Sequence, residues 1–188
     1  MNGKREQILQ SALGLFAAEG LGVPTAKIAQ EAGVANGTLF NYFPTKQDLI
    51  DTLYLNLKTE ITQLFLAGGA DKAKSLKGRS FVIWNSYIRW AIANPLKPKA
   101  MNLFKSANVL SARVLAEADD IFKPFYEMVQ DGIKGGKIMN LDVHYLYAIK
   151  AAQIGVCIDR ALARKLKGKA LEAHLLTGFT IYWKGVAA

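Results

Sequence analysis

The sequence predicts an all-α protein of about nine helices, and three observations support this. Apolar residues recur at helical spacing along most of the chain. Clusters of glycine and proline divide it into segments of helical length. Apart from parts of residues 33–43, no useful length alternates between apolar and polar residues as a half-buried strand does. The 188 residues suffice for a substantial core, and 51% hydrophobic and 21% charged residues are usual for a globular protein.

The first predicted helix covers residues 4–19 and ends at the glycine pair within residues 20–22. A short second helix is predicted over residues 26–32, with Thr25 as its N-cap and Gly33 as its end. The prediction of the first helix also rests on its apolar residues, which fall on one helical face: Ile8, Leu9, Ala12, Leu13 and Phe16.

Residues 33–43, GVANGTLFNYF, carry two conflicting signals. Asn36 and Gly37 suit a two-residue hairpin turn, and the aromatic residues after them suit a strand. However, helices are predicted on both sides, and a lone two-stranded ribbon would have no sheet to join. We therefore expect a third short helix here.

The next helix is predicted over residues 46–67, after a capping box formed by Thr45 and Asp48 and before the glycines at 68 and 69. Pro124 conflicts with a later helix and is expected to kink it or to mark a start near residues 119–120. The further predicted helices cover residues 79–93, 99–108, 111–133, 142–166 and 169–185.

The net charge of +9 is unevenly distributed. Residues 1–66 hold five basic and six acidic side chains, so this part carries −1 and the remainder carries +10. Bulk charge therefore gives no reason to assign nucleic-acid binding to the N-terminal region. Such an assignment must come from individual residues.

Residues 25–44 show the pattern of a helix-turn-helix, whose second helix enters the major groove of DNA. Ala29 is small where the two helices must cross, and Gly33 can adopt the positive φ that ends the first helix. The residues spaced to bury against each other and against the first helix are Ile28, Ala32, Val34, Leu39 and Tyr42.

The stretch TAKIAQEAGVANGTLFNYFPTKQDLI, residues 25–50, resembles the DNA-binding domain of the TetR family of transcriptional regulators (TetR/AcrR type). The resemblance covers about residues 4–66, and Gln47 replaces one acid of the family pattern. It implies a helix-turn-helix domain over residues 1–46, a connecting helix over 47–70, and a helical ligand-binding and dimerisation domain over 71–188.

The resemblance also implies which residues contact DNA. Asn41 would read a base edge, most naturally adenine, while Gly37 would let the backbone approach the duplex. Tyr42 and Lys46 would bind phosphates, and Leu39 and Phe43 are assigned to the core. The full set of predicted DNA contacts is Thr25, Lys27, Asn36, Gly37, Thr38, Phe40, Asn41, Tyr42 and Lys46.

Two departures from the family pattern affect this prediction. Ala35 stands where a Ser or Thr is common, so Asn36 is either a replacement N-cap or a base reader. Phe40 replaces the usual Tyr and keeps an apolar face for a thymine methyl group. Neither departure removes the predicted DNA-binding role.

In the C-terminal domain, the family resemblance implies a small-molecule effector that separates the two DNA-reading heads of a homodimer through the helix over residues 46–67. The alternative for both sets below is that they form the chain's own core. Predicted effector contacts are Trp84, Tyr87, Ile88, Met101, Phe104, Phe122, Phe125, Tyr126, Tyr145 and Gln153. Predicted dimer contacts are Ile154, Cys157, Ile158, Ala161, Leu171, Leu175, Phe179, Tyr182 and Trp183.

The sequence argues against an enzyme. The two histidines, His144 and His174, lie outside any metal-ligand spacing, and Cys157 has no basic neighbour to activate it. No glycine-rich phosphate loop occurs, so we expect no cofactor and no metal. The competing hypotheses are a ligand-responsive DNA-binding repressor and an all-helical ligand-binding or scaffolding protein that has lost its operator.

The sequence also predicts a cytoplasmic protein without a membrane partner. No apolar run approaches the roughly 20 residues that span a bilayer. The apolar residues after Lys4 and Arg5 are interrupted by polar ones, and no signal-peptide cleavage site follows. A single cysteine cannot form an internal disulfide, which fits a reducing compartment.

Overall fold

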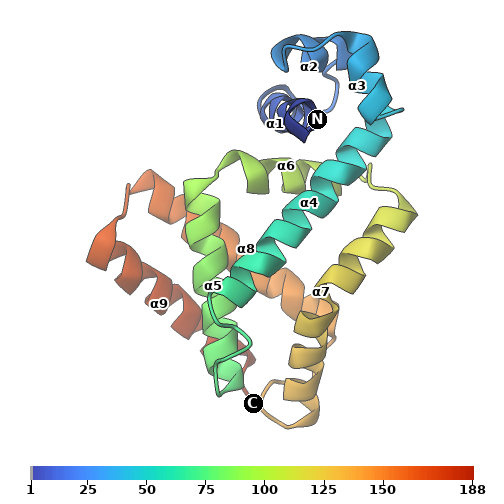
Figure 1. Ribbon diagram of the computed structural model, residues 1–188. Helices are drawn as coiled ribbons and strands as arrows, with labels where there is room; N and C mark the ends of the chain where they lie inside the picture. Colours follow the sequence, from blue (N-terminus) through green and yellow to red (C-terminus); the bar gives the residue numbers. More distant parts are fainter. Residues whose placement is uncertain (1) are drawn as a thin grey trace. The chain divides into compact units, whose positions relative to one another are not determined.

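The computed structural model describes residues 2–188, and this span contains nine α-helices and no β-strand, which confirms the all-α prediction (Figure 1). An isolated antiparallel bridge joins Ile138 and Ala187. The helices are α1 Asn2–Glu19, α2 Thr25–Glu31, α3 Asn36–Tyr42, α4 Lys46–Ala67, α5 Leu76–Ala93, α6 Leu96–Ser106, α7 Ala112–Lys134, α8 Val143–Ala163 and α9 Gly168–Val186.

The chain forms two compact units. Unit 1 comprises Met1–Glu60 with Asn94–Asp120, and unit 2 comprises Ile61–Ala93 with Ile121–Ala188. Unit 1 has nine basic and nine acidic residues, whereas unit 2 has fifteen basic and six acidic ones, so unit 2 holds the whole net charge. This division follows contacts within the chain, and the functional boundaries at residues 46 and 70 stay a prediction.

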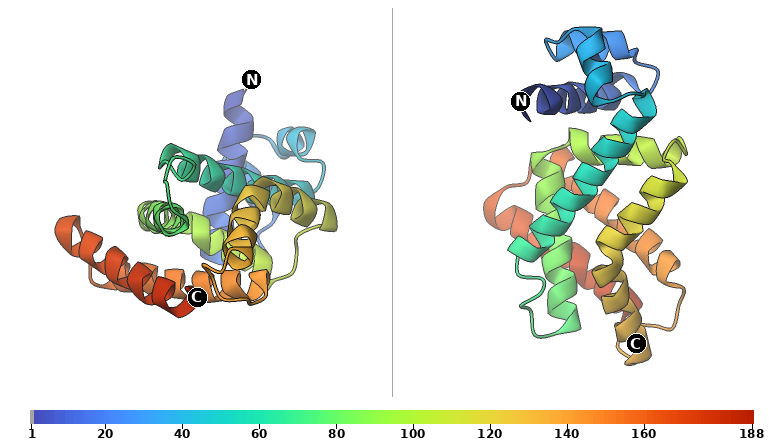
Figure 2. Two further views of the ribbon diagram at one scale, coloured as in Figure 1. Left: turned by 90° about the horizontal axis from the view of Figure 1, so that it is seen from below. Right: turned by 45° about the vertical axis from the view of Figure 1, so that its right-hand side comes forward.

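In unit 1, α1 lies between the α2–α3 pair on one side and α6 on the other (Figure 2). Ile8 and Phe16 of α1 are fully buried, and the Phe16 ring meets Phe104 of α6 edge-on at 5.9 Å. Edge-to-face contact is a favourable aromatic geometry and adds to the burial of both rings. α1 is thus the helix that contacts α2, α3 and α6 within unit 1.

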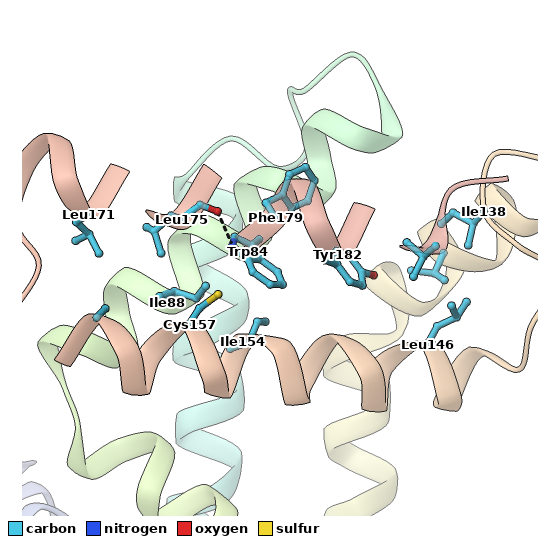
Figure 3. Packing of buried hydrophobic residues seen from close by; sticks show 13 residues of the cluster. Trp84, Ile88, Ile138, Leu146, Ile154, Cys157, Leu171, Leu175, Phe179 and Tyr182 are labelled. Atoms are coloured by element: carbon cyan, nitrogen blue, oxygen red, sulfur yellow. Dashed lines mark hydrogen bonds between the residues drawn. The ribbon is translucent and has the colours of Figure 1, made fainter. Parts of the chain in front are cut away.

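The core of unit 2 lies where α5, α8 and α9 pack together (Figure 3). Trp84 of α5 is fully buried, donates from Nε1 to the carbonyl of Leu175 at 3.2 Å, and stacks on Tyr182. A Cβ at Gly178 would lie 2.5 Å from the Cys157 sulfur. The glycine therefore lets α9 approach α8 closely.

The helix boundaries correct several sequence predictions. α5 and α6 begin three residues before the predicted starts at 79 and 99. Pro98 lies in the first turn of α6, where its missing N–H would have no partner in the helix. α7 runs unbroken through Pro124, so no helix starts near residues 119–120. Across residues 2–188, no helix is long and apolar enough to cross a membrane.

Candidate nucleic-acid interface

The turn between α2 and α3 is built around Gly33. This residue has φ +65°, its N–H donates to the carbonyl of Gln30, and the next N–H, of Val34, donates to Ala29, both at 3.0 Å. These two bonds form the Schellman motif that ends a helix with a left-handed residue. Ala29 is buried at the crossing. The hairpin signal in residues 33–43 is thus overruled, and the helix-turn-helix is formed.

α3 presents one buried and one exposed face. Leu39 and the following Phe43 are buried, as predicted. Residues four apart share a helix face, so the exposed Asn36 and Phe40 lie above each other, as do the exposed Gly37 and Asn41. The other predicted contacts on α2 and α3 follow the same division: Thr25, Thr38 and Tyr42 are half-buried, and Lys27 is exposed.

Neither short helix has the predicted side-chain cap. The N-cap of α3 is Ala35, and Asn36 is the first helical residue, so Asn36 is not the replacement cap. The Asn36 side chain makes no hydrogen bond to another residue of the described chain. In α2 the N-cap is Pro24, whose carbonyl accepts from Lys27 and Ile28, so the prediction of Thr25 as the cap is wrong by one residue.

Two predicted phosphate contacts are occupied within the chain. The ammonium of Lys27 pairs with Glu19 at 2.7 Å, and both side chains are about half exposed. The Lys46 ammonium donates to the carbonyls of Leu21 and Val23 at 2.5 and 2.6 Å. An ammonium has three N–H groups, so Lys46 retains one for a phosphate while it ties α4 to the loop after α1. The DNA contact of each lysine stays a prediction.

The predicted capping box at the start of α4 is confirmed. The Asp48 carboxylate accepts from the backbone N–H of Thr45 at 3.0 Å and from its hydroxyl at 2.7 Å. In return, the Asp48 N–H donates to the Thr45 hydroxyl at 3.0 Å. This reciprocal pair fixes where α4 begins directly after the recognition helix.

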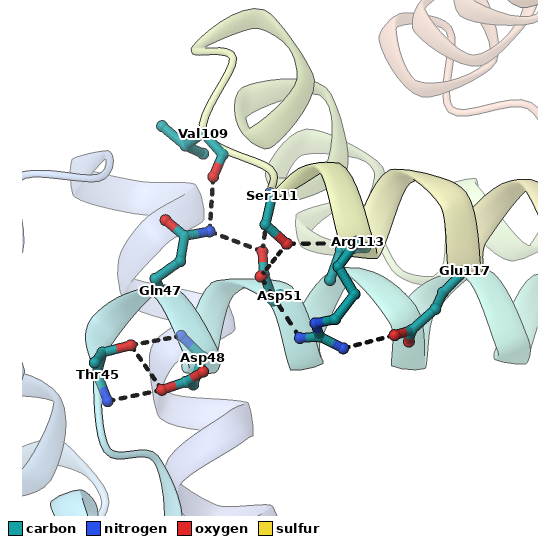
Figure 4. A network of polar contacts seen from close by, with 9 residues as sticks. Thr45, Gln47, Asp48, Asp51, Val109, Ser111, Arg113 and Glu117 are labelled. Atoms are coloured by element: carbon teal, nitrogen blue, oxygen red, sulfur yellow. Dashed lines mark hydrogen bonds and ion pairs between the residues drawn. The ribbon is translucent and has the colours of Figure 1, made fainter.

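A buried carboxylate near the start of α4 was missed by sequence reasoning (Figure 4). Asp51 is 3% exposed and accepts from the Ser111 hydroxyl and from the Gln47 amide, each at 2.7 Å. The same amide group of Gln47 also donates to the carbonyl of Val109 at 2.7 Å. Gln47, which replaces an acid of the family pattern, was a visible signal, but Val109 and Ser111, which complete the network, lie about 60 residues away along the chain.

The predicted effector residues do not gather in one unit. Met101 and Phe104 belong to unit 1, and the other eight belong to unit 2. Phe104 is part of the unit 1 core through Phe16, whereas Tyr145 is 56% exposed. Phe122 and Phe125 pack edge-on against Phe65 within unit 2.

The predicted dimer residues lie on the inner faces of α8 and α9. Seven of the nine are buried inside this chain, and the other two, Ile158 and Trp183, are half-buried against the same core. The opposite side of these two helices is therefore the exposed one. Its exposed large apolar residues are Tyr145, Val156, Leu162, Leu176 and Ile181.

No metal-binding group is assembled in the described part of the chain. His174 meets the carbonyl of Cys157 through Nε2 at 3.0 Å, so this histidine links α9 to α8. Burial raises the pKa of the Cys157 thiol, which opposes the thiolate form needed for nucleophilic chemistry.

Comparison with known proteins decides the family. The model of the bacterial regulatory proteins, tetR family, matches residues 8–53. A tetR family transcription regulator from Shewanella sp. PV-4 is 28% identical over 98% of each chain, with a TM-score of 0.86. Residues 8–53 thus belong to the TetR family. A TetR family protein from Vibrio parahaemolyticus is also 28% identical, over 98% of this chain and 99% of its own, with a TM-score of 0.79.

A curated relative supports the same assignment for the N-terminal third. The HTH-type transcriptional regulator LuxR of Vibrio harveyi is 36% identical over 69 residues, which is 36% of this chain. The match spans only 33% of the length of that relative. TetR-family proteins are transcription regulators and not enzymes, and the Shewanella and Vibrio parahaemolyticus relatives, which match nearly the whole chain, are described as such regulators.

Proposed function

We propose that this TetR-family regulator binds a palindromic DNA operator as a homodimer, represses transcription, and leaves the DNA when a small-molecule effector binds the domain over residues 71–188. The observation that carries the proposal is the exposed face of α3, where Asn36, Gly37, Phe40 and Asn41 face outward from a helix that is buried on its other side. A recognition helix needs this arrangement of an anchored and an open face.

The chemistry of the exposed face suits base readout. Asn41 carries a donor and an acceptor that match the major-groove edge of adenine, and Asn36 is available for the same role because it does not cap α3. Phe40 offers an apolar surface to a thymine methyl group. Gly37 costs the helix about 1 kcal/mol relative to alanine, and close approach to DNA explains its presence.

The outer faces of α8 and α9 suit a second copy of this chain. Residues 173–183 contain no Asp, Glu, Lys or Arg, although half of them face away from the core. Val156, Leu176 and Ile181 are 67%, 55% and 59% exposed. A helix that is apolar on both faces is normally covered on both. Two such helices from each protomer would form a four-helix interface.

Release of DNA would result from a change in the distance between the two recognition helices of the dimer. The recognition helices of a dimer must meet successive major grooves about 34 Å apart, so a change in their separation weakens binding. α4 contributes residues to both compact units and begins directly after the helix-turn-helix. The Asp51 network fixes the first turns of α4 to residues 109 and 111, so a shift of that segment would be felt at the reader.

DNA binding is tested by fluorescence anisotropy with the DNA upstream of the chain's own gene. Asn36→Ala with Asn41→Ala should weaken specific binding by about a hundredfold, because two base contacts are lost. Asn102→Ala, an exposed asparagine on α6, is the matched control and should bind normally. Equal binding of the wild type to this DNA and to a scrambled sequence would favour a scaffold protein that has lost its operator.

Dimerisation is tested by sedimentation velocity. Leu176→Glu with Ile181→Glu places two charges on the outer face of α9 and should yield folded monomers. Leu115→Glu introduces the same change at an exposed leucine of α7 and should remain dimeric. A double variant that sediments as the wild type would place the interface elsewhere.

A further inference from the structure

Lys150 is a cationic residue on the core-facing side of α8. It lies four residues after the buried Leu146 and four before the buried Ile154, so helical spacing places it on the core-facing stripe. Its side chain is half-buried, and its ammonium lies 5.7 Å from the ring centre of Tyr147. Lysines are almost never buried without a partner.

The groups around Lys150 provide no negative charge. Tyr147 meets Tyr126 of α7 edge-on at 4.7 Å, and Tyr126 in turn faces His144. The hydroxyls of Tyr126 and of Tyr182 on α9 lie close enough to Tyr147 to add, after burial, to the rise in its pKa. Phenols with raised pKa values stay neutral, and Lys150 forms no ion pair with any residue in the range 2–188.

Desolvation alone lowers the pKa of Lys150 from 10.5 to about 8. A neighbouring carboxylate would have raised this pKa, so its lowering agrees with the absence of an acidic partner. At neutral pH the group still carries its charge, and it is not compensated by this chain.

A second polar group without a partner lies one turn further along α8. The Oε1 atom of Gln153 is buried and accepts no hydrogen bond. The other buried side-chain oxygen of this kind in the described chain is the hydroxyl of Thr62, and both belong to unit 2. Buried polar atoms are hydrogen-bonded in more than nine of ten cases, so such atoms indicate a missing partner.

We propose that Lys150 binds the carboxylate of a small organic anion whose hydroxyl or N–H group donates to Gln153. This inference rests on the proposed effector response and names the chemical class of the effector. A monoanion fits because one cation is present, and the apolar and aromatic surroundings of α8 fit a hydrocarbon body. Pairing with the carboxylate supplies the negative counter-charge that Lys150 lacks, and the donor group satisfies the unpaired oxygen of Gln153.

The test measures binding to the protein without DNA, by isothermal titration calorimetry. The probes are 3-hydroxydecanoate and 3-phenyllactate, together with the neutral alcohols in which CH₂OH replaces the carboxylate. Lys150→Met should weaken carboxylate binding about tenfold or more and leave the alcohols unchanged, whereas Lys150→Arg should retain it. Lys123→Met, at an exposed lysine of α7, is the matched control. Gln153→Leu should weaken the hydroxy acid but not decanoate.

The pH dependence separates a direct charge contact from a structural role. Wild-type affinity for the carboxylate should fall as pH rises above about 8, where Lys150 loses its proton, while Lys150→Arg should keep its affinity. Circular dichroism establishes that each variant is folded. Equal carboxylate affinity in wild type and Lys150→Met, or no binding of either acid to the wild type, overturns the inference. A carboxylate that binds through Lys150 without releasing DNA would instead refute the proposed effector response alone.

Discussion

Two lysines with lowered pKa values, one in each unit, differ in the charged groups that surround them. Burial lowers the pKa of both Lys58 in unit 1 and Lys150 in unit 2 to about 8. Lys58 interacts further with Lys105, which lowers its pKa, and with Asp119, which raises it. For Lys150, burial is the one cause of the lowered pKa. Unit 1 thus places charged groups of both signs near its lysine, whereas burial alone lowers the pKa of the lysine in unit 2.

The two units also differ in whether a buried acidic or amide side chain has hydrogen-bond partners within the chain. In unit 1, buried Asp51 is held by Gln47 and Ser111, and it lies 3.9 Å from the guanidinium of Arg113. In unit 2, Gln153 leaves an oxygen unpaired. The Asp51 group of unit 1 is therefore satisfied within the chain, whereas the Gln153 oxygen of unit 2 is open to the effector that we propose.

The largest change in stability is expected when the buried carboxylate of unit 1 is removed. Asp51→Ala should lower the free energy of unfolding by about 3 kcal/mol, because the donors of Gln47 and Ser111 lose their acceptor. Urea unfolding measures this. Asp71→Ala removes an exposed acid and should change it by less than about 0.5 kcal/mol. A loss below about 1 kcal/mol for Asp51→Ala would break the contrast.

Removal of the Lys150 cation from unit 2 should stabilise the protein. Lys150→Met should raise the free energy of unfolding at pH 7 by about 1–3 kcal/mol, because an uncompensated charge leaves the interior. Lys123→Met should have little effect, since that side chain is exposed.

The pH dependence of this stabilisation follows from the lowered pKa of Lys150. In the unfolded chain the group keeps its proton up to about pH 10.5, but in the folded chain it releases the proton near pH 8. Between these values the unfolded state binds more protons, so wild-type stability rises with pH. The advantage of Lys150→Met should therefore be largest below pH 8 and shrink towards pH 10.5. A constant advantage across this range would contradict the account.

The same substitution, Gln to Leu, can be made in both units, and a smaller change in stability is expected from each. Gln47→Leu removes two hydrogen bonds and should destabilise the protein by about 1–2 kcal/mol. Gln153→Leu removes an unpaired oxygen and should be neutral or stabilising by up to about 1 kcal/mol. Thermal and urea unfolding of both variants provide the measurement, and the same sign for both would count against the distinction.

The smallest effect is expected at the surface of unit 1. Lys27→Ala breaks the exposed pair with Glu19 and should change stability by less than about 0.5 kcal/mol. If Lys27 contacts a phosphate, DNA binding should weaken equally for all sequences, and the slope of log affinity against log salt should fall by about one. Anisotropy titrations at several salt concentrations measure both quantities.

Local features of the fold were predictable from the sequence, and distant ones were not. The helix-turn-helix and the Thr45–Asp48 capping box were found because their bonds join residues no more than five apart. Pro124 was misjudged because it lies, like Asp120 one turn earlier, on an exposed face, where a carbonyl that loses its partner can stay in water.

The sequence pattern could not decide between the predicted dimer contacts and the alternative that these residues form the chain's own core. α8 and α9 are apolar on both faces, so periodicity could not show which face meets the chain's own core and which is exposed. The Asp51 network was hidden because Ser111 lies 60 residues away along the chain. Lys150 was overlooked because a single lysine in an apolar helix is usually a surface residue. Only the tertiary structure shows which residues surround it.

The most direct test of the account is whether an organic anion releases the DNA. Fluorescence anisotropy would monitor this release from preformed DNA complexes of the wild type, Lys150→Arg and Lys150→Met. Addition of 3-hydroxydecanoate should free the DNA from the wild type and from Lys150→Arg at similar concentrations. Lys150→Met should bind DNA normally and need about ten times more of the acid for release. Release of all three complexes at the same concentration would contradict the account.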